Sequence, residues 1–183
     1  VHMSAIGADP HSSSIYARTK AEGEQAVLAG GGAAIVLRTA WVFSAEGSNF
    51  VKTVLRLAEG GAPLTIVADQ VGCPTPAAAI AGTMRDVAVA LRADPGLAGL
   101  YHYAGRPAVS WAGFARGILA AAGRAAPVED IATADWPTTA QRPPYTVLDT
   151  GRIKDVFGVE APPWRPALAG VLREVTGRHE HGH

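Results

Sequence analysis

A tyrosine and a lysine four residues apart, Tyr16 and Lys20 in the segment SSSIYARTKAEGE, are the pair in this chain best suited to chemistry. Residues with this spacing lie on one face of a helix, so the phenol and the ammonium group would be neighbours. A tyrosine in water titrates near pH ~10, and a nearby positive charge favours its phenolate form. The pair therefore indicates proton transfer to a substrate oxygen, as carbonyl reduction requires.

The elements that must position this pair follow an α/β pattern, because short β-rich runs alternate with longer helical patterns. Residues 1–5 are expected to form a strand, Ser13 or Ser14 to cap the Tyr16 helix, and residues 33–44 to form one buried strand. Further helices are expected at 49–59, 110–123 and 166–175, and a turn followed by an alanine-rich helix at 72–94. A strand and turn are expected at 64–70, and further strands at 99–105 and 128–132. The helix at 49–59 would bury a stripe of Phe50, Val54, Leu57 and Ala58.

Composition narrows the class of protein. With 183 residues, of which 48% are hydrophobic, the chain can bury a core as a single α/β unit, residues 1–183. Sixteen basic residues balance sixteen acidic ones, which argues against a nucleic-acid or membrane-surface binder and favours a small-molecule ligand. No apolar run is long enough to span a membrane and no signal-peptide pattern is present, so we expect a cytoplasmic protein.

Cysteine and histidine usage offers little metal or redox chemistry. Cys73 is the only cysteine, which excludes an internal disulfide and a cysteine-based zinc site, and we interpret it as a structural residue. The terminal segment RHEHGH carries three alternating histidines but no second ligand cluster nearby, so we expect a solvated tail.

Eight segments occur in an order and spacing that resemble one family. They are YARTKAEGE, LRTAWVFSAEGSNFVKTVLRLA, DQVGCPT, GLYHYAG, SWAGFA, TTAQRP, LDTGRI and PPWRPAL. Together they resemble the dTDP-4-dehydrorhamnose reductases, which are extended short-chain dehydrogenases/reductases. The resemblance implies a partial Rossmann-like parallel sheet over about residues 1–98 and a mainly substrate-binding part over about residues 99–183.

The resemblance also assigns roles to the residues of the reaction. Tyr16 would be the general acid for the substrate carbonyl oxygen, and Lys20 would bind the ribose of NADPH or NADH while holding a positive charge near the phenol. A serine or threonine hydroxyl completes such a site; Ser4 is our candidate, with the serines at 12–14 as competitors. The family usually has a longer segment between that hydroxyl and the tyrosine. Some relatives are thought to use magnesium.

Further residues are implied at the ligand site. Thr39 and Ala40 would approach the nicotinamide, and Trp41, just beyond a buried strand, would stack near a sugar nucleotide, with a core tryptophan as the alternative. Other substrate contacts would come from Asn49, Phe50, Gln70, Thr75 and Arg142. Asn49 and Phe50 are equally well interpreted as a helix cap and its first buried residue, Gly72 as a turn glycine, and Arg142 as a solvated surface residue.

The dinucleotide fingerprint of such enzymes, Gly-x-x-Gly-x-x-Gly after a strand, does not occur among the 21 glycines. We therefore expect the chain to correspond to the C-terminal part of a reductase, with an open sheet edge that favours a homo-oligomer. Three functions remain open: reduction of a 4-keto sugar nucleotide, reduction of other small ketones or dicarbonyls such as signal molecules, and non-catalytic binding of a sugar nucleotide.

Overall fold

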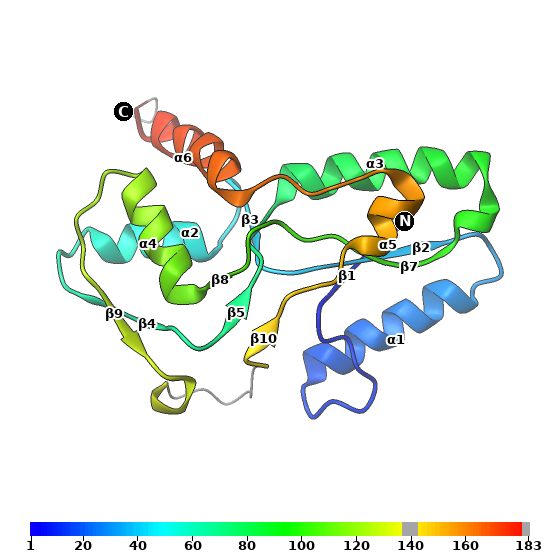
Figure 1. Ribbon diagram of the computed structural model, residues 1–183, viewed down its shortest axis with the longest axis horizontal. Coiled ribbons are helices and arrows are strands. Elements are labelled where there is room, and N and C mark those ends of the chain that lie inside the picture. The colour runs from blue at the N-terminus through cyan, green and yellow to red at the C-terminus, as the bar shows by residue number, and fades with distance from the viewer. Residues whose placement is uncertain (137–142, 181–183) are drawn as a thin grey trace.

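The computed structural model describes residues 1–136 and 143–180 and has an α/β fold (Figure 1). Its helices are α1 (Ile15–Ala29), α2 (Phe50–Ala58), α3 (Ala77–Ala93), α4 (Trp111–Ala121), α5 (Gly151–Phe157) and α6 (Trp164–Glu180), with short 3₁₀ turns at Pro95–Leu97 and Thr133–Asp135. Its strands are β1 (His2–Ala5), β2 (Ile35–Thr39), β3 (Val42–Phe43), β4 (Leu64–Val67), β5 (Val71–Gly72), β6 (Thr75–Pro76), β7 (Gly99–His102), β8 (Val109–Ser110), β9 (Val128–Ile131) and β10 (Tyr145–Thr146).

The main sheet is parallel and has the strand order β1-β2-β7. Helix α3 covers one face and α1 the other (Figure 1). On the α3 face, Ile35 and Leu37 of β2 pack with Ile80 and Val87 of α3. This arrangement confirms the predicted α/β class with parallel strands joined by helices.

A second core lies beside this sheet and is built from α2, α4, α6 and β4 (Figure 1). Its largest buried side chains include Phe43, Phe114 and Trp164, and the Trp164 indole donates a hydrogen bond to the Pro107 carbonyl at 3.0 Å. β4 pairs in parallel with β9 along its edge. Each core takes residues from both sides of residue 98. The two cores therefore do not correspond to the two predicted parts of the chain, and the division near residue 98 stays a prediction.

The prediction of one continuous strand over 33–44 was wrong. β2 ends at Thr39, and Trp41 takes the left-handed conformation with φ 49°, which no residue inside a strand can adopt. The chain then resumes as β3, which pairs with β6, and the Trp41 carbonyl accepts a hydrogen bond from the Thr75 amide at 3.0 Å. The break redirects the chain from the main sheet to the second core.

Helix starts follow the predicted caps. The Ser14 hydroxyl accepts a hydrogen bond from the Ala17 amide at 3.4 Å, and the Ser110 hydroxyl accepts one from the Gly113 amide at 3.0 Å. Helix α5 was not predicted, because its 7 residues bury only Ile153 and so show no helical periodicity.

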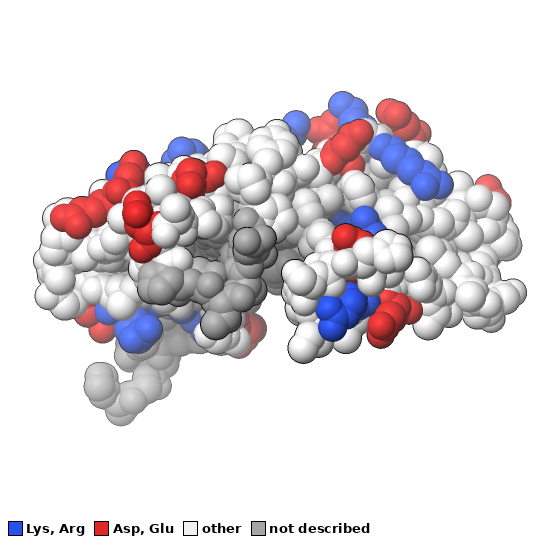
Figure 2. Space-filling view, turned by 90° about the horizontal axis from the view of Figure 1, so that it is seen from below, with Lys and Arg blue, Asp and Glu red and all other residues white. Residues whose placement is uncertain are grey.

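No helix within the described ranges combines the length and the apolar character that crossing a membrane requires. On the face shown in Figure 2, lysines and arginines lie beside aspartates and glutamates in small groups, as the balanced composition leads one to expect.

Substituting Gly117 tests the second core. A Cβ at this position would lie 2.6 Å from Cη2 of Trp164, whose ring is fully buried and hydrogen-bonded. We expect Gly117→Ala to lower the free energy of unfolding by about 1–3 kcal/mol in urea titrations. Gly82→Ala in α3 is the matched control, because nothing lies within 4 Å of its Cβ, and it should raise stability by up to ~1 kcal/mol. Equal stability of the Gly117→Ala and native proteins would contradict this packing.

Candidate active site

Helix α1 brings Tyr16 and Lys20 together as the spacing predicts. The Lys20 Nζ lies 5.7 Å from the centroid of the Tyr16 ring, and the tyrosine side chain is 60% exposed. No ion pair joins Lys20 to a carboxylate of the described residues, so its ammonium group remains available to act on the phenol or on a ligand.

This pair is not part of the buried face of α1, which carries Ala17, Ala21 and Glu24. Gly23 continues the stripe of Tyr16 and Lys20 by one turn, and a Cβ at Gly23 would lie 3.6 Å from the His2 ring on β1. Among the described strands, β1 pairs with β2 alone, and Met3 beside it is 46% exposed. β1 is therefore an edge strand of the described sheet, and self-association through it stays a prediction.

Ser4 of β1 faces the buried side of helix α1, whereas Tyr16 lies on the exposed side of that helix. Ser4 is 3% exposed, its hydroxyl has no hydrogen-bond partner of standard geometry among the described residues, and its strand neighbour is Arg38 of β2. The hydroxyl helps to lower the pKa of the nearby Glu24 carboxyl without forming a hydrogen bond of standard geometry. Two of the three competing serines have local roles, since Ser14 caps α1 and the Ser12 hydroxyl accepts a hydrogen bond from the Ser14 amide.

A buried ion pair beneath α1 was missed in the sequence. Arg38 Nε and Nη2 donate to the two Glu24 carboxylate oxygens at 2.7 and 2.6 Å, and Nη2 also donates to the Ala8 carbonyl at 3.2 Å. Burial raises the pKa of Glu24, but the Arg38 hydrogen bonds and charge outweigh it, so the net pKa is lowered. The signal was available, because Ala17, Ala21 and Glu24 share the helical spacing of a buried face.

The carboxyl end of β2 supplies the residues expected at the nicotinamide. Thr39 and Ala40 are both 4% exposed, and the Thr39 hydroxyl has no hydrogen-bond partner in the part of the chain that the structure describes. A buried hydroxyl without a partner costs free energy unless a ligand or water satisfies it. The nicotinamide contact predicted for Thr39 and Ala40 stays a prediction.

Three predicted substrate residues meet at one cavity of about 580 Å³. It is lined by Asn49, Phe50 and Gln70 together with Ser48, Thr53, Val54, Leu57, Thr65, Ile66, Val67, Trp111 and Trp136. The predicted α2 stripe was wrong in part, because Val51 and Val54 are the fully buried positions, whereas Leu57 is 47% exposed and faces this cavity. Trp111 and Trp136 were missed as lining residues.

The amide side chains of the cavity are already oriented by neighbours. Asn49 caps α2 by accepting a hydrogen bond from the Lys52 amide, and its Nδ2 donates to the Ser44 carbonyl at 2.8 Å. Gln70 Nε2 donates to Thr133 Oγ1 at 3.1 Å. Asn49 therefore caps α2 and also lines the cavity, so its two interpretations are compatible.

Two other predicted ligand residues, Trp41 and Thr75, are not among the described residues that line the cavity. Trp41 stacks on Trp111, with ring centroids 3.5 Å apart and an interplanar angle of 8°. Thr75 is fully buried; its hydroxyl donates to the Cys73 carbonyl and accepts from the Gly105 amide at 3.1 Å. Arg142 lies outside the described residues.

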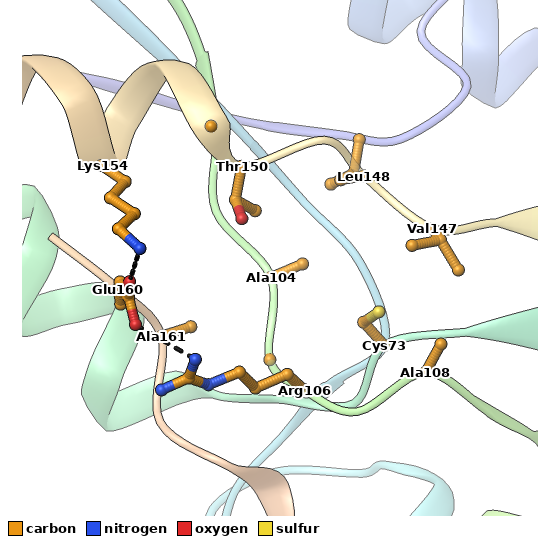
Figure 3. A pocket seen from close by; sticks show the side chains of 12 residues that line it. Cys73, Ala104, Arg106, Ala108, Val147, Leu148, Thr150, Lys154, Glu160 and Ala161 are labelled. Carbon is orange, nitrogen blue, oxygen red and sulfur yellow. Dashed lines mark ion pairs between the residues drawn. The ribbon is translucent and has the colours of Figure 1, made fainter.

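A second hollow, of about 330 Å³, is lined by none of the predicted ligand residues that the structure describes (Figure 3). Glu160 at its rim pairs with Arg106 at 3.1 Å and with Lys154 at 2.5 Å, and these cations, Lys154 first, lower its pKa. Cys73 lies in the wall, where burial raises its pKa, as suits an unreactive thiol. No group of three or more histidine, cysteine, aspartate or glutamate side chains that could hold a metal ion occurs among the described residues.

Comparisons with known proteins connect this geometry to a family. The family model for the RmlD substrate binding domain matches residues 7–176. The chain is 39% identical over 168 residues to a dTDP-4-dehydrorhamnose reductase of Aggregatibacter actinomycetemcomitans, covering 88% of this chain and 57% of that protein. A reductase of the same name from Burkholderia thailandensis is 41% identical over 172 residues, covering 87% and 58%.

Solved structures give the same result. A dTDP-4-dehydrorhamnose reductase from Bacillus anthracis in complex with NADP superposes with a TM-score of 0.81 at 28% identity, covering 94% of this chain and 64% of that one. The ortholog from Clostridium acetobutylicum gives 0.84, also at 28% identity, covering 96% and 65%. The chain thus spans somewhat more than half the length of the relatives it matches. These matches confirm the resemblance: the chain belongs to the RmlD substrate-binding domain family of extended short-chain dehydrogenases/reductases.

Proposed function

We propose that this chain is the substrate-binding and proton-donating part of an NADPH- or NADH-dependent reductase that converts a 4-keto sugar nucleotide, of the dTDP-4-dehydrorhamnose type, to its alcohol. The observation that carries the proposal is the accessible Tyr16 phenol beside Lys20, in a chain of this family. The NADP complex of the Bacillus anthracis relative supports the choice of a nicotinamide cofactor.

The proposed proton transfer uses groups of this chain. The cofactor, when bound, supplies the hydride for the carbonyl carbon. Tyr16 donates its phenolic proton to the carbonyl oxygen as negative charge develops there, and Lys20 favours the phenolate that remains. Lys20 and the Thr39 hydroxyl would hold the ribose and nicotinamide end, with Ala40 alongside. Ser4 remains our candidate for orienting the carbonyl, although its hydroxyl lies on the buried side of α1.

The nucleotide would occupy the 580 Å³ cavity, which falls in the size range of small-molecule sites. Phe50 and Trp111 offer aromatic faces for a base, and Asn49 and Gln70 offer amide groups for hydrogen bonds. Trp41 would contribute through its stack on Trp111. For the diphosphate we propose Arg142, because a guanidinium can donate two parallel hydrogen bonds to phosphate oxygens.

The reductase function is tested by incubating the protein with dTDP-4-dehydrorhamnose and either NADPH or NADH. We expect absorbance of the reduced cofactor to fall only when the keto sugar is present, and not when dTDP replaces it. A small diketone in a parallel reaction tests the broader substrate range. Faster turnover of the diketone than of the sugar nucleotide would overturn the assignment of the substrate.

A second function, binding of a sugar nucleotide without turnover, is favoured by one specific observation. The described lining of the 580 Å³ cavity comes from this chain alone, so a nucleotide can bind there without a cofactor. Calorimetric titration separates the two functions, because a pure binding module would bind dTDP and show no affinity for either reduced cofactor.

A further inference from the structure

Gly72 of β5 leaves the space that the Trp41 ring occupies. A Cβ at Gly72 would lie 2.3 Å from Cε2 and 2.5 Å from Nε1 of Trp41, and 2.7 Å from Oγ1 of Thr146. Gly72 is not one of the glycines with positive φ, so the backbone freedom of a turn does not explain it. The absence of a side chain at this position is required by packing against the indole.

Trp41 is itself held in an unfavourable backbone conformation. Among the described residues it alone, apart from glycines, has a positive φ, 49°. Such a conformation persists only where its surroundings determine it. Here the surroundings are the backbone of Gly72 on one side and the Trp111 ring on the other, stacked at 3.5 Å between centroids.

Trp111 connects Trp41 to the ligand cavity. Its indole lines the cavity and also contacts Phe50, with ring centroids 4.6 Å apart and an interplanar angle of 58°. Contacts with Trp41 and Phe50 therefore restrict the rotamers available to the Trp111 side chain. A wall that is fixed before binding costs less conformational entropy when a ligand stacks on it.

We propose that Gly72 and Trp41 are positioning residues, which hold the Trp111 ring as a preformed wall for the flat pyrimidine base of the nucleotide. The nature of this ligand rests on the proposed function. The stack of Trp41 on Trp111, and its dependence on Gly72, rest on the geometry alone.

The test is Gly72→Ala, with two measurements. Stacked indoles couple their electronic transitions and give a paired positive and negative circular dichroism band, which we expect the substitution to abolish. Titration with dTDP should show about three- to tenfold weaker binding, the range of one aromatic stacking contact. Titration with inorganic pyrophosphate, which has no base, should show no change.

Two double variants show whether the effects of Gly72→Ala act through Trp41. In a Thr146→Ala background, Gly72→Ala should still abolish the paired band, because the clash with Trp41 remains. In a Trp41→Ala background, Gly72→Ala should weaken dTDP binding no further. An unchanged band in Gly72→Ala, or an equal loss of affinity in the Trp41→Ala background, would overturn the proposal. If native protein binds no dTDP, the proposed function fails, and the band alone decides the positioning role.

Discussion

Tyr16→Phe is expected to lower the rate of carbonyl reduction by about 10²–10⁴-fold while leaving the affinity for dTDP unchanged. The substitution removes only the phenolic hydroxyl, so the carbonyl oxygen loses its proton donor and no residue lining the nucleotide cavity is altered. Rates of cofactor oxidation and dTDP titrations measure the two quantities. Because the ring is 60% exposed, the loss of its hydroxyl should not affect folding.

Tyr145→Phe is the matched control, because this tyrosine is 68% exposed on β10 and does not line the cavity. It should retain the native rate. A Tyr16→Phe protein that reduces the substrate as fast as the Tyr145→Phe protein would show that Tyr16 is not the acid.

Removing Glu24 is expected to have the largest effect on stability. Its carboxylate is the bidentate partner of Arg38, and Glu24 itself is 5% exposed. Breaking a buried pair typically costs about 3–5 kcal/mol, and because the Arg38 side chain is 24% exposed we expect about 2–3 kcal/mol for Glu24→Ala. Urea titrations at neutral pH measure the loss. Glu22→Ala, an exposed position on the same helix, should change stability by less than about 0.5 kcal/mol.

The Glu24 contribution should also depend on pH. The pKa of this carboxyl is lowered in the folded protein from its ordinary value of 4.5, so the folded state binds fewer protons there than the unfolded state. The stabilisation is therefore complete above about pH 4.5 and is lost as the pH falls through the folded pKa. The stability difference between native protein and Glu24→Ala should shrink over that acidic window. A difference that stays constant would mean that the ion pair is not its source.

The features predicted correctly from the sequence are those set by near neighbours in the chain. Ser14 and Ser110 cap their helices through hydrogen bonds to amides three residues later, and Tyr16 meets Lys20 across one helical turn. These relations require no knowledge of the tertiary structure. Likewise, the alternation of strand and helix patterns was enough for the α/β class.

The features that were missed depend on residues far apart in the chain. The break at Trp41 is stabilised by Trp111 and by the space at Gly72, neither of which is a sequence neighbour. Trp111 fits the apolar stripe of its helix, and it does pack against the second core. That its ring also lines the cavity depends on residues outside the helix. The pairing of Glu24 with Arg38 joins a helix to a strand. Helix periodicity places Glu24 on the buried face but does not identify its partner.

The most direct test of the reductase function follows the transferred hydrogen. The protein is incubated with dTDP-4-dehydrorhamnose and NADPH deuterated at both C4 positions of the nicotinamide, and the sugar nucleotide is analysed by mass spectrometry. We predict a reduced product that carries one deuterium on carbon with native protein, and almost none with Tyr16→Phe. Recovery of only the unlabelled keto sugar from the native reaction would contradict the proposed function.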